Sequence, residues 1–435
     1  MRQTGGLQIH LEWESADGVT SPSLAATWCR LQVQVEGRYV SAVEDRRTSS
    51  MRRGVYTSAY PLAEWIAENW WLLNNHVRPS MVPRKSWTWA NARRQPWLQS
   101  HNFRAAGGGL PWPDLTIVPE GAVTRLVWNA GPGLSDQPVT FLTSGDNYIA
   151  SNEVTDALAR FVDQVLVRLK DAGLVDTPLQ QEWLLVTESD PAEKAFAAAV
   201  ARLGQDPYDV PEGLADDVVG LAKALEPDVL DEFLDSAHPS SLRAALSWLE
   251  QASDVVRTKH RPGLDSPTDW LLAYADGKDR ATPWGLAYAA ARAYREQLGL
   301  AALEVFDAGD YVGSTSLDTP AGGLQGLVIV RDAGVGLVLP AEMDTSDLSL
   351  RFAQARALGL SLLTQRRQLV LDPAHTDLSK ASRAFAAELL APADGIATYL
   401  SALPETTGAA LEAVAARFKV SALVVQHQYE NQIAH

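Results

Sequence analysis

The chain has 435 residues, 46% hydrophobic and 21% charged, a composition typical of folded domains that excludes a disordered chain or a coiled coil. Its apolar runs are all shorter than the roughly 20 residues that span a bilayer, and the single cysteine, Cys29, excludes an internal disulfide and a cysteine-based zinc site. The net charge of −16 is uneven, since residues 1–110 carry 13 Lys and Arg against 8 Asp and Glu, and the remainder 24 against 45. We expect two or three domains with different tasks and a cytoplasmic location.

The first 175 residues predict an α+β domain rich in strands. Residues 7–14 and 28–35 alternate apolar and polar side chains, the period of a half-buried strand, and Glu36-Gly37 predicts a hairpin turn after the second. A helix is expected to begin at Pro61, and a longer amphipathic helix to run over 152–173 and end at a glycine. Further strands are predicted at residues 115–118, 126–128 and 139–142.

The rest of the chain divides into two further segments. Residues 190–260 are acidic and helical in pattern, with prolines at positions where helices begin, and they predict a helical connector. Residues 265–435 predict a third domain, with a helix over 284–298, strands over 324–330 and 335–339, and at least three more helices. The expected fold is therefore a multidomain α+β protein.

Three blocks of this third domain share their order and spacing with a known family. Residues 351–363 read RFAQARALGLSLL, residues 385–392 read FAAELLAP, and residues 415–421 read AARFKVS. They resemble the blocks R-F-t-l-A-H-E-L-G-H-l-L-L, F-A-A-x-L-L-m-P and A-x-x-F-x-V-S of the ImmA/IrrE family, zinc-dependent endopeptidases of bacteria and mobile elements. The resemblance covers roughly residues 270–433 and implies a zincin-like fold for this domain.

The chemistry of that family depends on residues that this chain has changed. In an H-E-x-x-H helix two imidazoles bind one zinc ion and the glutamate activates the bound water. Those positions hold Arg356, Ala357 and Leu360, and the position of the family's third ligand, a glutamate, holds Ala381. Arginine offers no lone pair to a metal, alanine cannot act as a base, and leucine cannot coordinate zinc. The resemblance therefore implies a non-catalytic relative that holds neither a metal nor another cofactor.

Two other arrangements stay open for this region. Asp372, His375 and Glu388 carry the donor atoms for a rebuilt metal site, although His375 also fits an ordinary loop residue and Glu388 a solvated helix residue. Alternatively, Arg356 faces solvent or an acidic partner, with Glu388 as the candidate, because a buried guanidinium without an acceptor is too unfavourable to keep.

The N-terminal third combines basic and aromatic residues. Ten of the 14 tryptophans lie at or before Trp128, interleaved with arginines. Cations neutralise phosphates and aromatic faces stack on unpaired bases, so this composition favours a nucleic-acid groove. Alternatively, the tryptophans belong to the core and the arginines are solvated or paired with the acidic part of the chain. The candidate contacts are Arg46, Arg47, Arg52, Arg53, Arg84, Lys85, Trp87, Trp89, Arg93 and Arg94.

A second pattern associated with DNA lies near the end of the sequence. Residues 411–430 resemble a helix-turn-helix, but the second helix carries no Lys or Arg. The terminal helices of the ImmA/IrrE family account for the same pattern without DNA.

These patterns support three hypotheses about function. The first is a pseudo-peptidase that acts as an interaction or sensing module in mobile-element control, stress response or phage defence, with a protein partner such as a regulator or defence component and no membrane association. The second is a nucleic-acid-binding subunit of such a system. The third is an active metallo-endopeptidase with a rebuilt site. Metal content and affinity for nucleic acid distinguish them.

Overall fold

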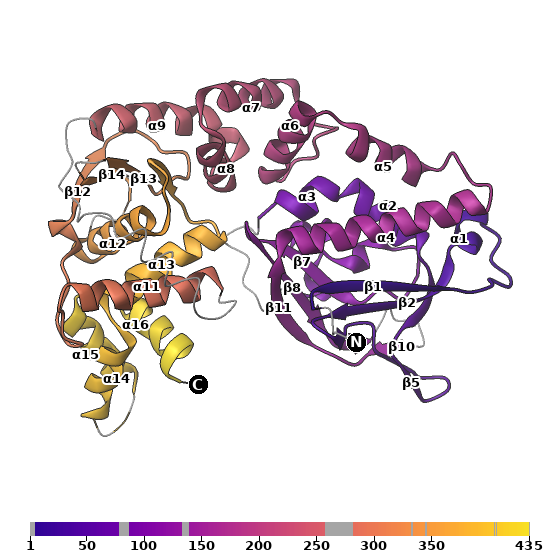
Figure 1. Ribbon diagram of the computed structural model, residues 1–435, viewed down its shortest axis with the longest axis horizontal. Helices are drawn as coiled ribbons and strands as arrows, with labels where there is room; N and C mark the ends of the chain where they lie inside the picture. Colours follow the sequence, from indigo (N-terminus) through magenta and orange to yellow (C-terminus); the bar gives the residue numbers. More distant parts are fainter. Residues whose placement is uncertain are drawn as a thin grey trace. The chain divides into compact units, whose positions relative to one another are not determined.

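A computed structural model describes most of the chain. The described residues are 5–77, 87–132, 139–256, 282–331, 334–343, 346–403, 405 and 407–434. The chain divides into two compact units, residues 1–219 and 220–435, and both contain helices and strands (Figure 1). The mixed α+β class predicted from the sequence is therefore confirmed.

The boundary between the units falls inside the segment 190–260, for which the sequence predicts a connector. Helix α6 (Pro191–Arg202) packs against α3 (Trp70–Asn75) of the first unit, and α8 (Pro227–Ser236) packs against β15 (Gln368–Leu371) of the second. The segment thus contributes helices to both units.

The first unit begins with the antiparallel sheet that the alternating residues predict. Strand β1 (Leu7–Trp13) pairs along its whole length with β2 (Trp28–Val35), and β2 continues through Glu36 and Gly37 into β3 (Arg38–Tyr39). Both turn residues have positive φ, 48° and 76°, as a type I′ hairpin requires. The prediction of this turn is confirmed.

Two more antiparallel sheets complete the strands of the first unit. One has the order β5-β4-β10-β9 and the other β11-β8-β7. The second contains strands predicted at 115–118 and 126–128. Strand β6 (Val55–Ser58) belongs to the first sheet, where it pairs with β2. The bounds of the other strands are β4 Val43–Asp45, β5 Ser50–Arg52, β7 Asp114–Pro119, β8 Val123–Asn129, β9 Gly131–Pro132, β10 Val139–Phe141 and β11 Gly145–Ala150.

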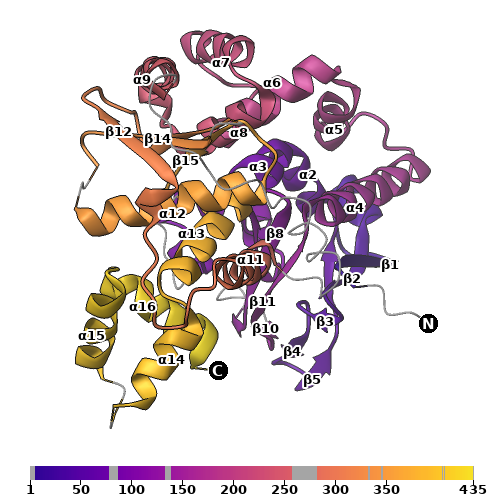
Figure 2. The ribbon, with the colours of Figure 1, turned by 60° about the vertical axis from the view of Figure 1, so that its left-hand side comes forward.

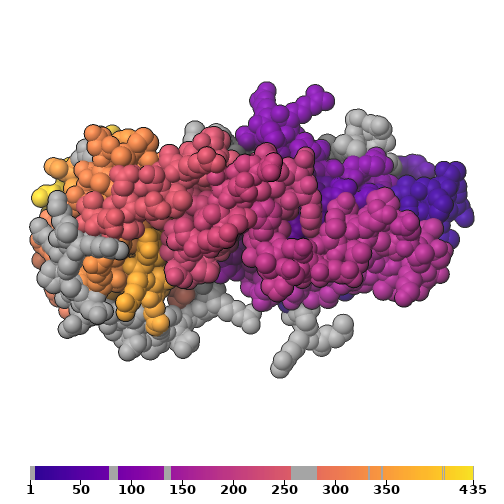
Figure 3. All heavy atoms as spheres, turned by 90° about the horizontal axis from the view of Figure 1, so that it is seen from above, coloured from indigo at the N-terminus to yellow at the C-terminus, as the bar shows by residue number. Residues whose placement is uncertain are grey.

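Helices pack against the sheet of β1 and β2 and against the sheet of β7, β8 and β11. The helix expected from Pro61 is interrupted at Asn69, so that α2 (Tyr60–Glu68) and α3 are separate. Helix α4 (Ser151–Asp171) packs on α2 and β1, and Gly173 after it has a φ of 78°. The surface helices α5 (Pro178–Glu188) and α6 follow, and Figure 3 shows the face on which they lie. Helix α7 spans Glu212–Ala224, and the short 3-10 helices are Trp89–Asn91, Pro96–Gln99 and Phe103–Ala106.

The second unit is built on a mixed sheet of order β12-β14-β13-β15, in which β12 is parallel to β14 and the other pairs are antiparallel. Figures 1 and 2 show α8 and α9 on one face and α12 and α13 on the other. The remaining bounds are β12 Val312–Leu317, β13 Gly326–Arg331, β14 Gly334–Pro340, α9 Leu242–Val256, α11 Pro283–Gln297, α12 Asp347–Leu363, α13 Asp377–Leu390, α14 Ala393–Ser401, α15 Gly408–Phe418, α16 Ala422–Gln428 and the π-helix Tyr429–Ile433.

Helices α12 and α13 cross at close range within this unit. A Cβ atom on Gly359 would lie 2.7 Å from Cδ1 of Phe385, so the crossing requires a glycine. Leu358 and Leu362 of α12 and Leu389 of α13 are buried in the same core. The two helices therefore pack against each other in the core of the second unit. Of the helices in the described part of the chain, none combines the length and apolar character that crossing a membrane requires.

Candidate functional site

Arg356, in the position of the first zinc ligand of the family that the sequence resembles, points from α12 toward α13 and is only 6% exposed. Its Nε donates a hydrogen bond to Oγ of Ser382 (3.2 Å) and its Nη1 to Oε1 of Gln325 (2.9 Å). Its Nη2 donates to the carbonyl oxygen of Asp372 (3.1 Å) and to Oγ of Ser379 (3.3 Å). The guanidinium is thus buried with acceptors on all three nitrogens.

The carboxylate of Asp372 completes this buried polar cluster. Ser379 Oγ donates to its Oδ1 at 2.7 Å, and the backbone N–H of Ala374 donates to the same oxygen at 2.8 Å. Arg383 donates to Ser379 Oγ (3.2 Å) and to the carbonyl oxygen of Ala374 (2.7 Å). Both guanidinium groups therefore donate to the Ser379 hydroxyl, which in turn donates to the carboxylate of Asp372.

Burial dominates the electrostatics of the cluster. It lowers the pKa of Arg356 to about 9, with a further decrease from neighbouring Arg383 and an opposing effect of Asp372. It raises the pKa of Asp372, against the hydrogen bond from Ser379 and the charge of Arg356. At neutral pH the guanidinium stays cationic, and Ser379 links it to the carboxylate of Asp372.

The expected pairing of Arg356 with Glu388 is wrong. Ser382 and Glu388 are six residues apart on α13, a rise of about 9 Å along the helix axis, and Arg356 contacts the Ser382 end. Arg356 is also not open to solvent. The other three family positions, Ala357, Leu360 and Ala381, are buried within the apolar core, so their side chains offer no polar atom to a ligand.

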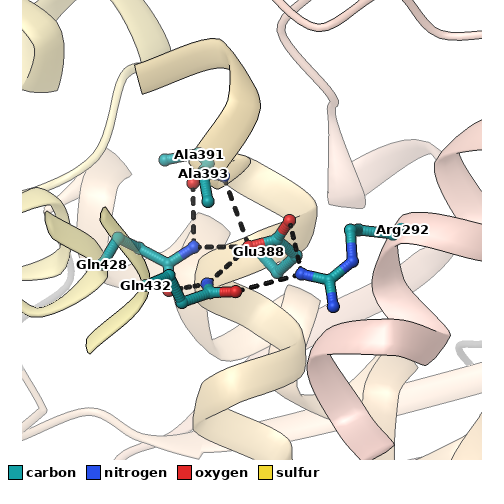
Figure 4. Close-up of polar contacts among 6 residues, drawn as sticks. All are labelled: Arg292, Glu388, Ala391, Ala393, Gln428 and Gln432. Atoms are coloured by element: carbon teal, nitrogen blue, oxygen red, sulfur yellow. Dashed lines mark hydrogen bonds and ion pairs between the residues drawn. The ribbon is translucent and has the colours of Figure 1, made fainter. Parts of the chain in front are cut away.

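Glu388 belongs to a different cluster at the C-terminal end of α13 (Figure 4). Its Oε2 accepts hydrogen bonds from Nε2 of Gln428 and of Gln432, both at 2.8 Å, and from the backbone N–H of Ala393 at 3.3 Å. Its Oε1 lies 3.5 Å from Nη1 of Arg292, on α11. The side chain is 1% exposed, which contradicts the interpretation of Glu388 as a solvated helix residue. It links α13 to α11, α14 and the terminal helices.

The three candidates for a rebuilt metal site do not come together. Asp372 is bonded to Ser379 near the start of α13, and Glu388 lies nine residues beyond Ser379, a rise of about 13 Å. His375, in the loop before α13, already takes part in an interaction within the chain. Within the described ranges, no group of three His, Cys, Asp or Glu side chains is arranged to hold a metal ion.

In the N-terminal third, the arginines of the β4–β5 hairpin have different surroundings. Arg46 and Arg47 are exposed beside the turn, and Nε of Arg46 donates to Oγ1 of Thr140 at 2.7 Å. Arg52 forms an ion pair with Asp45 on the paired strand, with 2.9 Å between Nη2 and Oδ2. The guanidinium of Arg53 lies over the ring of Tyr39, 5.1 Å from its centroid. Arg52 and Arg53 are therefore engaged locally.

Two more basic candidates, Arg93 and Arg94, lie in the loop region before β7. Arg93 and Arg94 are exposed just after the 3-10 helix Trp89–Asn91. Arg84 and Lys85 fall outside the described residues. The exposed pairs thus come from two separate segments of the first unit.

The expectation that Trp87 stacks on a nucleic-acid base is wrong. Its side chain is 1% exposed and packs in a small core with Trp97, their ring centroids 6.1 Å apart. The guanidinium of Arg125 covers it at 5.4 Å. Trp89 is partly buried against the same core, and its backbone N–H donates to the carboxylate of Asp114. For Trp87, the alternative interpretation as a core residue is the correct one.

The terminal helices have the order of a helix-turn-helix without its basic surface. Helix α15 ends at Phe418, the capping residue Lys419 adopts the left-handed conformation with a φ of 54°, and α16 follows. Val414 and Phe418 of α15 and Val425 of α16 are buried in the core of the second unit.

Several buried polar groups could not be identified from the sequence. Glu232 of α8 accepts hydrogen bonds from Arg366 and from the backbone N–H of Val370 on the edge strand β15, and burial raises its pKa to about 7. In the sequence it is one of many acidic residues of the predicted helical connector. Ser379 and Ser382 likewise give no signal until α13 is placed beside α12. Burial also raises the pKa of the Cys29 thiol to about 12, which makes it a poor nucleophile.

Comparison with known proteins adds no assignment. No protein-family model matches the sequence, and no curated protein is significantly similar to it.

Proposed function

We propose that the second unit is a non-catalytic, zincin-like relative of the ImmA/IrrE peptidases. In this proposal it acts as an interaction or sensing module in mobile-element control, stress response or phage defence, and it binds a protein partner without cleaving it. The observation that carries the proposal is the state of Arg356. A side chain in the position of a zinc ligand is buried, cationic and bonded to Ser382, Gln325, Asp372 and Ser379.

The chemistry of the four altered positions supports a binding role. A peptidase of this type needs three ligands, an open coordination position and a base. A guanidinium in the place of one imidazole would repel a divalent cation, and the methyl group of Ala357 cannot accept a proton. Apolar packing around Gly359 and Phe385 holds the two helices together. The helix pair is thus stable without the metal that would join it in an active relative.

We expect the purified protein to contain far less than one zinc ion per chain, because Arg356, Ala357, Leu360 and Ala381 provide neither ligands nor base. Elemental analysis after dialysis measures this. The triple variant R356H/L360H/A381E restores the family's ligand set, and we expect it to bind about one zinc ion per chain if these positions have zincin-like geometry.

The matched control is A357H/S361H/A381E, which has the same ligand types on the adjacent face of α12 and is expected to bind no tight zinc. Circular dichroism establishes that both variants fold. Equal zinc binding by the two variants would contradict the family assignment, and stoichiometric zinc in the unaltered protein would contradict the loss of the site. Affinity capture from the host then tests whether a bound partner stays uncleaved.

Nucleic-acid binding by the first unit is the second candidate, favoured by the exposure of Arg46, Arg47, Arg93 and Arg94. If it is correct, a labelled single-stranded oligonucleotide should bind at low salt, and the affinity should fall steeply as salt rises because phosphate contacts release counterions. R93A/R94A should weaken binding to all sequences alike. The control R160A/K170A removes the same charge from α4 and should have no such effect. Fluorescence anisotropy measures both, and absence of binding at low salt would exclude this function.

A further inference from the structure

A groove on the surface of the first unit exposes several large apolar side chains. It has a volume of about 650 Å³ and lies along α5, α6 and the residues that follow them. Leu184, Leu185 and Tyr208 in its lining are 51%, 47% and 47% exposed. Phe196 and Val219 add to the same surface. Large apolar side chains gathered in a concave site mark a place for a partner, unlike single hydrophobic residues scattered on a surface.

The groove lies in a strongly acidic segment of the chain. Glu188 and Glu193 belong to its lining. Residues 182–219 contain nine Asp and Glu against two Lys and Arg, a net charge of −7. Burial raises the pKa of the Tyr208 hydroxyl, and the carboxylates of Glu182 and Glu193 raise it further. A partner that fits this field must carry positive charge beside its apolar contacts.

The helices that line the groove limit which conformation of a partner can bind there. Much of the lining comes from α5 and α6, whose amide and carbonyl groups are hydrogen-bonded along the helices. An extended peptide would find no strand edge there with which to pair, so binding must come from side chains. Side chains at helical spacing fit between the ridges of two helices.

We propose that this groove binds an amphipathic helix of a partner protein, with apolar side chains on one face and Lys or Arg residues along its flanks. The inference is independent of the proposed function, because it concerns α5 and α6 of the first unit and the proposed pseudo-peptidase is the second unit. A negative result at the groove therefore leaves the zinc experiments unaffected.

The test uses the full chain and a fluorescein-labelled peptide of about five helical turns, with leucines at i, i+3, i+4 and i+7 and lysines elsewhere. One comparison peptide has the same composition in scrambled order, and another has glutamate in place of lysine. At about 0.15 M salt we expect saturable binding of the first peptide, at least about tenfold tighter than binding of either comparison peptide. If the scrambled peptide binds with equal affinity, the binding depends on charge alone and the proposal is overturned.

Variants locate the binding site. L184D/L185D removes two apolar side chains from the groove and adds two negative charges, which by themselves attract a cationic peptide. If the peptide binds in the groove, its affinity should nevertheless fall at least about tenfold. The matched control V167D/V175D adds the same charges at residues that are 59% and 69% exposed outside the groove, and it should bind as the unaltered chain does. Undiminished binding by L184D/L185D would overturn the proposal. The proposal would also be overturned if sedimentation shows that the unaltered chain forms a dimer and that L184D/L185D abolishes it, because the groove would then join two copies of this chain.

Discussion

Below pH 6.5 the first unit should lose stability steeply, by about 4 kcal/mol at pH 5 relative to pH 7.5. The cause is a pair of histidines, the half-buried His76 and the buried His101, whose ring centroids are 5.2 Å apart. Burial lowers the pKa of His76 to about 4. Burial, together with the neighbouring His76, lowers the pKa of His101 to about 3. His101 also stacks on Trp97, with a centroid distance of 4.2 Å.

The direction of the effect follows from the folded pKa values, which lie below the ordinary value of 6.5. The unfolded chain takes up protons first as the pH falls, so the stability from the neutral rings is complete above pH 6.5 and decreases toward pH 3–4. Each histidine contributes a slope of about 1.4 kcal/mol per pH unit in this window, or about 2 kcal/mol at pH 5.

Denaturant unfolding at several pH values, followed by tryptophan fluorescence, measures this loss. Eleven of the 14 tryptophans precede residue 220, so the signal reports mainly on the first unit. The variant H76Q/H101Q removes both titrating groups and should flatten the dependence between pH 6.5 and 5, whatever its stability at pH 7.5. H10Q, at an exposed position of β1, is the control and should keep the full slope. A slope unchanged by H76Q/H101Q would show that other groups cause the acid sensitivity.

Glu388→Ala should lower the free energy of unfolding of the second unit by about 3–5 kcal/mol. The substitution removes a buried carboxylate, takes one of two acceptors from each of the amides of Gln428 and Gln432, and leaves the backbone N–H of Ala393 without the acceptor it has in the folded chain. Because the carboxylate joins α13 to the terminal helices, the decrease in local stability should be largest around residues 422–433. Chemical denaturation gives the total, and hydrogen exchange gives the location.

The same terminal segment provides the control. Glu430 accepts a hydrogen bond from Gln426 at 2.8 Å on the solvent-exposed side. Because exposed polar pairs contribute little, E430A should change the free energy of unfolding by less than about 1 kcal/mol. A similar effect of E388A and E430A would mean that the cluster in Figure 4 is not a structural link.

Local patterns in the sequence are sufficient to predict many of the helices and strands. The strict alternation of residues 7–14 and 28–35 gave β1 and β2, and Glu36-Gly37 gave the turn, because side-chain period and turn conformation depend on neighbouring residues. Strands β12, β11 and β15 were not predicted. The polar residues of β12 are typical of a loop, and its pairing with β14 depends on residues far along the chain.

The sequence by itself determined the mixed α+β class and the positions of the basic and aromatic residues. Tertiary structure alone decided what these side chains do. It placed Trp87 in a core and bonded Arg356 to Ser382, whereas the sequence favours solvent or an acidic partner, with Glu388 as the candidate. The physical reason is that burial and hydrogen bonding depend on which elements meet in space, and a sequence specifies such contacts only through the fold as a whole.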